Sequence, residues 1–145
     1  MDWNFHNLFS ISKKFIIVLM SFVLLIEDDP LLVDIYLTKL KESGFEVDFA
    51  NDGEKAIEKI REKVPDIILL DLLLPKIDGW GILEKIKEMK RKEPQKFENL
   101  KIMILSNLGQ KEDVEKALML GADKYLIKSQ FTPTEVVEEI RKLIL

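Results

Sequence analysis

The sequence has no cysteine, only one histidine, and no surplus of positive charge. Without cysteine, the chain cannot form disulfides, bind zinc through thiolates or use a thiol nucleophile. The formal net charge is −4, whereas nucleic-acid binding requires a clustered basic surface. We therefore expect no direct nucleic-acid partner. The absence of cysteine also suits a reducing cytoplasm, where we expect the protein to reside.

The 145 residues are 47% hydrophobic and 33% charged, with 6 glycines and 5 prolines. This composition is typical of a folded globular protein with enough apolar residues to form a core. The length is that of a single domain, so we expect no second one. The lone histidine, His6, lies near the N-terminus. We expect it to be solvated and not to be a ligand.

The first 19 residues require a separate interpretation. Lys13 and Lys14 precede the apolar run FIIVLMSFVLLI, which leads directly into Glu27. A signal peptide is disfavoured because no small-residue cleavage site follows, and the run is too short to span a bilayer. An arm lying at a membrane surface is one interpretation. The other is that Met20 is an alternative start, so that residues 1–19 are a surplus, non-native arm and residues 20–145 form the domain.

Short strand-like runs alternate with helix-like segments after Met20. Several of the runs are continuously apolar, as expected for parallel strands covered on both faces. The intervening segments place apolar residues at helical spacing, for example Ile82, Leu83, Ile86 and Met89. We therefore predict a doubly wound α/β fold, a five-stranded parallel sheet of flavodoxin-like order 2-1-3-4-5 with five flanking helices. The predicted strands are residues 22–26, 45–50, 66–70, 101–105 and 124–127.

Capping and turn signals mark the same boundaries. Asp29 followed by Pro30 is typical of a helix start, and TPTE at residues 132–135 has the pattern of a capping box. Gly44 and Gly121 are placed to end helices. The charged connection KRKEPQKFENL, residues 90–100, is interpreted as a solvated excursion before the fourth strand.

Polar residues stand at the carboxyl ends of the predicted strands, where ligands bind in such sheets. Glu27 and Asp28 follow the first strand, Asp71 the third, Ser106 the fourth and Lys128 the fifth. Strands one and three are neighbours in the predicted order, so their three carboxylates should converge. Carboxylates that close repel one another unless a cation lies among them. The hard ion Mg²⁺ suits such oxygen ligands.

Lys128 and Ser106 each have a simple structural interpretation. The lysine could be a counter-ion for the acids, and the serine could begin a turn. Together with the carboxylates, however, they would surround one acid with a metal, a cation and a hydroxyl. This combination suits phosphoryl transfer, with Asp71 as the nucleophile that forms an acyl phosphate.

From about Met20 to Leu145 the chain resembles the response-regulator receiver domains of two-component signalling. The segments LLIEDD, DIILLDLLLPKIDGW, IMILSN and GADKYLIKS occur in the order and spacing of that family. The resemblance implies that Asp71 is the phosphoacceptor and that Asp28 binds Mg²⁺ directly. Glu27 would act mainly through metal-bound water, and the backbone carbonyl of Leu73 would be a further ligand.

The resemblance also implies a switch. Lys128 would pair with the phosphoryl group, Ser106 would be the switch hydroxyl, and Tyr125 would change rotamer with it. A histidine kinase or histidine phosphotransfer protein would donate the phosphoryl group. The domain would catalyse its own phosphorylation and dephosphorylation without being a conventional enzyme. The fourth helix, fifth strand and fifth helix, roughly residues 110–145, would signal to a downstream protein.

Because no effector domain follows Leu145 in this sequence, we expect a stand-alone, single-domain receiver. We also expect no association with a membrane. Two positions depart from the usual pattern. Ser129 replaces the proline that commonly follows the lysine, which disfavours a cis bond and predicts a looser loop. Asn107 replaces a small residue after Ser106. The alternative functions are a receiver-like interaction module that does not switch and a metal-dependent phosphatase, although Leu73 replaces the second acid of such phosphatases.

Overall fold

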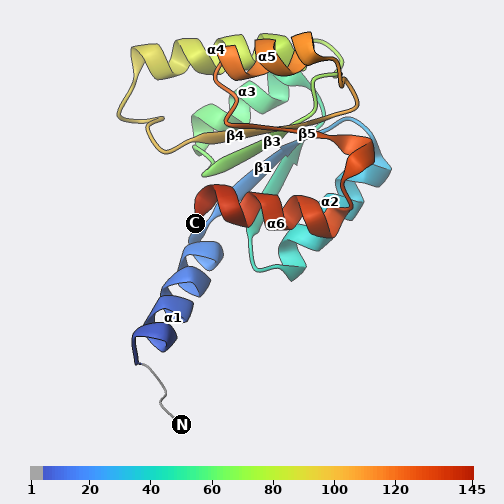
Figure 1. Ribbon diagram of the computed structural model, residues 1–145. Helices are drawn as coiled ribbons and strands as arrows, with labels where there is room; N and C mark the ends of the chain where they lie inside the picture. Colours follow the sequence, from blue (N-terminus) through green and yellow to red (C-terminus); the bar gives the residue numbers. More distant parts are fainter. Residues whose placement is uncertain (1–4) are drawn as a thin grey trace.

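The structure is a computed structural model that describes the backbone of residues 5–145 and the side chains of residues 13–145. The side chain of His6, predicted to be solvated, lies outside the described residues. Within residues 5–145 the chain alternates helices and strands in a regular order (Figure 1). The elements are α1 (Phe5–Met20), β1 (Phe22–Ile26), α2 (Pro30–Glu42), β2 (Glu46–Ala50), α3 (Gly53–Glu62), β3 (Ile67–Leu70), α4 (Gly79–Lys92), β4 (Lys101–Ser106), α5 (Lys111–Met119), β5 (Lys124–Ile127), the 3-10 helix η1 (Lys128–Gln130) and α6 (Pro133–Ile144).

The five strands form one parallel sheet in the order β2-β1-β3-β4-β5. This confirms the predicted fold and strand order. Helices α2 and α6 cover one face of the sheet, and α3, α4 and α5 cover the other (Figure 1). These are the five predicted flanking helices. The sixth helix of the described chain, α1, precedes β1.

Side chains from successive strand positions form two apolar layers, as the period of a strand dictates. Ile68 of β3 and Ile102 of β4 pack in the layer beneath α3 and α4. Leu69 and Met103, their neighbours in sequence, pack on the opposite face. All four are at most 1% exposed, which explains why these strands read as continuous apolar runs.

The predicted capping signals are present. Asp29 accepts a hydrogen bond from the backbone N–H of Leu31 at 2.9 Å, and Pro30 begins α2. Thr132 and Glu135 form the reciprocal capping box at the start of α6. Gly44 and Gly121 have φ values of 94° and 106°, a region that favours glycine and lets the chain turn after a helix.

Helix α1 begins away from the sheet and ends beside it, just before β1 (Figure 1). The apolar run FIIVLMSFVLLI is therefore split between two elements: its first half ends α1 and its second half forms β1. Val18 is 9% exposed and packs against the core layer that includes Leu40 and Phe45. No helix in the described part of the chain is long and apolar enough to cross a membrane.

The prediction of a solvated excursion over residues 90–100 is wrong in part. Phe97 and Leu100 are only 1% and 2% exposed, and both belong to the core layer under α4. The ammonium group of Lys90 donates to the carbonyl of Leu100 at 2.9 Å. Two buried apolar anchors therefore hold this charged segment against the domain.

Candidate functional site

Three predicted site residues meet at the carboxyl edge of the sheet because their strands are neighbours. Ile26 at the end of β1 is paired with Leu70 at the end of β3, so the residues that follow lie side by side. One carboxylate oxygen from each of Glu27, Asp28 and Asp71 lies within 4.8 Å of the other two. The predicted convergence of these acids is therefore present.

The three acids have different environments. Glu27 and Asp71 are buried, at 3% and 8% exposure, whereas Asp28 is exposed to solvent. Burial raises the pKa of Glu27 to about 7, and its hydrogen bond and charge repulsion with Asp71 act in the same direction. Lys128 only partly offsets these effects. A proton on Glu27 thus relieves part of the repulsion in this cluster.

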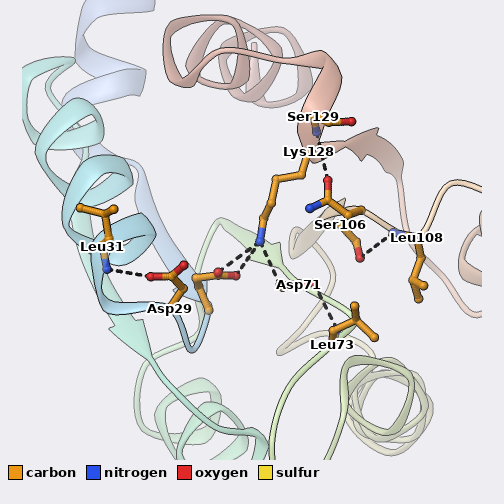
Figure 2. A network of polar contacts seen from close by, with 10 residues as sticks. Asp29, Leu31, Asp71, Leu73, Ser106, Leu108, Lys128 and Ser129 are labelled. Atoms are coloured by element: carbon orange, nitrogen blue, oxygen red, sulfur yellow. Dashed lines mark hydrogen bonds and ion pairs between the residues drawn. The ribbon is translucent and has the colours of Figure 1, made fainter.

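Lys128 connects the two buried acids. Its Nζ lies 3.0 Å from Oδ2 of Asp71 and 3.1 and 3.2 Å from the two carboxylate oxygens of Glu27 (Figure 2). Burial opposes the charged form of the lysine, but its contacts with Asp71 and Glu27 outweigh that effect and raise its pKa. The ammonium group is thus a fixed positive charge beside Asp71.

The loop after β3 presents Asp71. Oδ1 of Asp71 accepts a hydrogen bond from the backbone N–H of Leu73 at 3.1 Å. The loop then closes tightly, because the N–H of Gly79 donates to the carbonyl of Leu72 at 3.0 Å. A Cβ atom on Gly79 would lie 2.4 Å from the Cα of Leu72. Glycine is required for this close approach. The role of the Leu73 carbonyl as a metal ligand stays a prediction.

Ser106 and Tyr125 are linked through one loop residue, Leu108. The buried Ser106 ends β4, and its Oγ accepts from the backbone N–H of Leu108 at 3.3 Å. The Tyr125 hydroxyl donates to the carbonyl of Leu108. Burial raises the pKa of Tyr125, so it remains a neutral donor at neutral pH. The predicted switch pair therefore shares a contact in the loop between β4 and α5.

One contact at this edge was not predicted. The side-chain Oδ1 of Asn107 accepts a hydrogen bond from the backbone N–H of Ser129 at 3.1 Å (Figure 2). The segment after β5 is a turn of 3-10 helix, η1, and no cis peptide bond occurs among residues 5–145. The looser loop stays a prediction. Both residues had been noted separately as departures from the family pattern. They directly follow Ser106 and Lys128 at the ends of adjacent strands. From these positions their contact could have been predicted.

The acids fit a hard divalent cation. When ionised, the three carboxylates carry −3 and Lys128 carries +1, which leaves −2 at the site. Carboxylate oxygens are the protein ligands that Mg²⁺ prefers, and an exposed acid such as Asp28 leaves room for bound water. The arrangement can therefore bind a cation beside Asp71, where Lys128 also supplies a positive charge.

Comparison with known proteins shows the family. Residues 23–141 match the family described as "Response regulator receiver domain". The chain therefore belongs to the response-regulator receiver domains of two-component systems. A putative response regulator from Chloroflexus aurantiacus is 28% identical, with a TM-score of 0.73 over 86% of this chain and 97% of that one. A structure titled "BeF3 Activated DrrB Receiver Domain" shares the fold, with a TM-score of 0.72 at 23% identity over 86% and 97% of the two chains.

The curated relatives are longer proteins. A "Probable transcriptional regulator ycf27" of Guillardia theta is 34% identical over 84% of this chain and 44% of its own length. The "DNA-binding dual master transcriptional regulator RpaA" of Synechocystis sp. is 33% identical over 84% of this chain and 48% of its own length. The chain thus spans about half the length of the curated relatives it matches.

Proposed function

We propose that this receiver domain is a phosphorylation-activated switch whose phosphoacceptor is Asp71. The observation that carries the proposal is the ion pair between Lys128 and Asp71, 3.0 Å long, beside the acids Glu27 and Asp28. A receiver that had lost its chemistry would not need a buried cation beside a buried acid, because such groups are costly to desolvate.

The phosphoryl donor is a phosphohistidine of a histidine kinase or a histidine phosphotransfer protein. A carboxylate oxygen of Asp71 attacks phosphorus, the P–N bond breaks, and the imidazole leaves with the bonding electron pair and takes up a proton. The product is an acyl phosphate on Asp71. Lys128 holds a positive charge against the phosphoryl oxygens as their charge develops. The domain thus supports its own phosphorylation and later hydrolysis and has no separate turnover substrate.

Mg²⁺ is the proposed cofactor. Asp28 and Asp71 would bind it directly, the Leu73 carbonyl would complete the protein ligands, and Glu27 would act through bound water. When bound, the ion neutralises phosphoryl oxygens. The protein's own contribution is to hold these oxygen ligands together at the ends of β1 and β3.

The output surface is the one formed by α5, β5 and α6, roughly residues 110–145. Ser106 is drawn to the new phosphoryl oxygens, and Tyr125 moves with the loop to which both are bonded. This changes the population of conformers that a downstream protein can bind. Only a partner with different affinities for the two conformers can respond to that change in population.

Two expectations about the whole protein stay predictions: that it acts in the cytoplasm, and that residues 1–19 are a surplus arm before a start at Met20. The expectation of a stand-alone receiver has no support from the curated relatives, which are longer proteins. The expectation of no direct nucleic-acid partner conflicts with relatives named as transcriptional regulators, one of them DNA-binding, and we do not retain it. The charge on which it rested describes only the 145 residues of this sequence, and less than half of each relative aligns with them.

The deciding experiment is the intact mass of the protein after incubation with Mg²⁺ and acetyl phosphate. We expect one phosphoryl adduct that requires Mg²⁺, and none in Asp71→Asn. An adduct of equal yield in Asp71→Asn would contradict the assignment of the phosphoacceptor. If folded protein accepts no phosphoryl group from acetyl phosphate or from a range of histidine kinases, the interaction module that does not switch is the better description.

A further inference from the structure

Asn107 and Ser129 join the two segments that carry Ser106 and Lys128. Asn107 directly follows Ser106 at the end of β4, and Ser129 directly follows Lys128 at the end of β5. The two strands are neighbours, with Ser106 paired to Ile127. The Asn107 side chain bridges the strand ends by accepting the N–H of Ser129 at 3.1 Å.

This bond has a local structural basis. Lys128 to Gln130 form the 3-10 helix η1, and the first N–H groups of any helix lack partners within the helix. Ile127, the residue before η1, provides no side-chain cap. The cap comes instead from the neighbouring strand, through Asn107. We call this contact, Asn107 Oδ1 with Ser129 N–H, the strand-end clasp.

We propose that the strand-end clasp makes Asn107 a positioning residue, one that holds the segment after Ser106 in its phosphoryl-free arrangement. The inference rests on the proposed function, in which Ser106 moves toward a phosphoryl group on Asp71. Asn107 must move with Ser106 because the two are adjacent in the chain. Lys128, by contrast, is anchored by its ion pairs with Asp71 and Glu27.

In this proposal the clasp and the phosphorylated arrangement exclude one another. A hydrogen bond of 3.1 Å is lost when its atoms separate by a few tenths of an ångström more, so movement of Asn107 relative to η1 breaks the clasp. The phosphorylated arrangement therefore forms at the expense of one hydrogen bond. Both residues are exposed, so water can replace the partners and the effect is modest.

The test uses beryllofluoride with Mg²⁺ as a reversible phosphoryl analogue and measures its affinity by calorimetry. We expect Asn107→Ala to bind the analogue about two- to tenfold more tightly than wild type, which is the range of one exposed hydrogen bond. Ser129→Ala keeps the backbone N–H and should bind like wild type.

A second background separates the clasp from other effects of residue 107. Ser129→Pro removes the donor N–H, so Asn107→Ala should cause no further change in that background. The proposal that the clasp holds the phosphoryl-free arrangement would be overturned by either of two results. One is an equal effect of Asn107→Ala in both backgrounds, and the other is unchanged or weaker binding of the analogue by Asn107→Ala. Absence of any Mg²⁺-dependent binding to wild type would instead overturn the proposed function. Faster amide hydrogen exchange at Ser129 in Asn107→Ala than in wild type would show that the hydrogen bond between these residues exists in solution.

Discussion

Lys128 and Asp71 form an ion pair whose side chains are only 13% and 10% exposed. Removing one member of a buried pair leaves the other charge without compensation, which costs more than losing a surface contact. Lys128→Met keeps most of the length of the unbranched side chain and removes the charge. In metal-free buffer at pH 8, we expect it to lower the free energy of unfolding by about 3 kcal/mol, measured by urea denaturation.

The matched control for this prediction is Lys124→Met. Lys124 pairs with Glu139 near the surface, where its own side chain is 37% exposed. The expected loss there is below about 1 kcal/mol. Equal losses in the two variants would contradict the view that Lys128 neutralises a buried acid cluster.

Glu27 gives a prediction about pH. Its pKa is about 7 in the folded protein and 4.5 in its ordinary state, so the folded protein retains the proton to a higher pH. The stability of metal-free wild type relative to Glu27→Gln should be greatest below pH 4.5 and fall as the pH rises to about 7. Each unit corresponds to roughly 1.4 kcal/mol, so the fall is at most about 3.5 kcal/mol. Urea denaturation of both proteins between pH 4.5 and 8 measures it.

Glu139 provides a control of opposite sign. Its hydrogen bond with Lys124 lowers the pKa of its carboxyl group, so its contribution is present above the ordinary pKa and is lost as the pH falls. Wild type should therefore lose stability relative to Glu139→Gln on acidification. A Glu27 difference that does not change with pH would show that the carboxylate is already ionised at pH 5.

The centre of the sheet was predictable because β1, β3 and β4 are buried on both faces. Leu69 and Met103 lie on one face, and Ile68 and Ile102 lie on the other, so the sequence is apolar without interruption. The meeting of Glu27, Asp28 and Asp71 followed from the strand order alone. These features depend on periodicity and topology, which a sequence reports directly.

Other features depend on how loops fold. Phe97 lies in a segment dominated by charge, and only the path of the chain after α4 places it in the core. The hydrogen bond between Asn107 and Ser129 requires the 3-10 turn at η1. The spacing of apolar residues in the sequence does not indicate such a short turn. The elevated pKa of Glu27 likewise arises from its burial and its distance to Asp71 in the folded chain.

The capping box of α6 gives a prediction about the proposed output surface. The Thr132 hydroxyl accepts from the N–H of Glu135 at 3.2 Å, and the Glu135 carboxylate accepts from the N–H of Thr132 at 3.1 Å. Thr132→Ala should lower the free energy of unfolding by about 1 kcal/mol in urea denaturation. Thr134→Ala, in the same first turn but outside the box, should change it by less than about 0.5 kcal/mol. Similar losses in both would indicate a general effect of the first turn.

Gly79 tests whether the loop after Asp71 must close tightly. A Cβ atom there would lie 2.6 Å from the carbonyl oxygen of Asp71 and 2.4 Å from the Cα of Leu72, so the backbone itself must shift. Gly79→Ala should cost about 2–3 kcal/mol of stability and slow phosphorylation by acetyl phosphate, because the displaced backbone carries Asp71. At Gly109 the closest atom to the added Cβ would be the end of the Ile127 side chain at 3.2 Å, which can move. Gly109→Ala should therefore leave the free energy of unfolding within about 1 kcal/mol of wild type. If Gly79→Ala were as stable and as rapidly phosphorylated as wild type, the close packing of this loop could not be what positions Asp71.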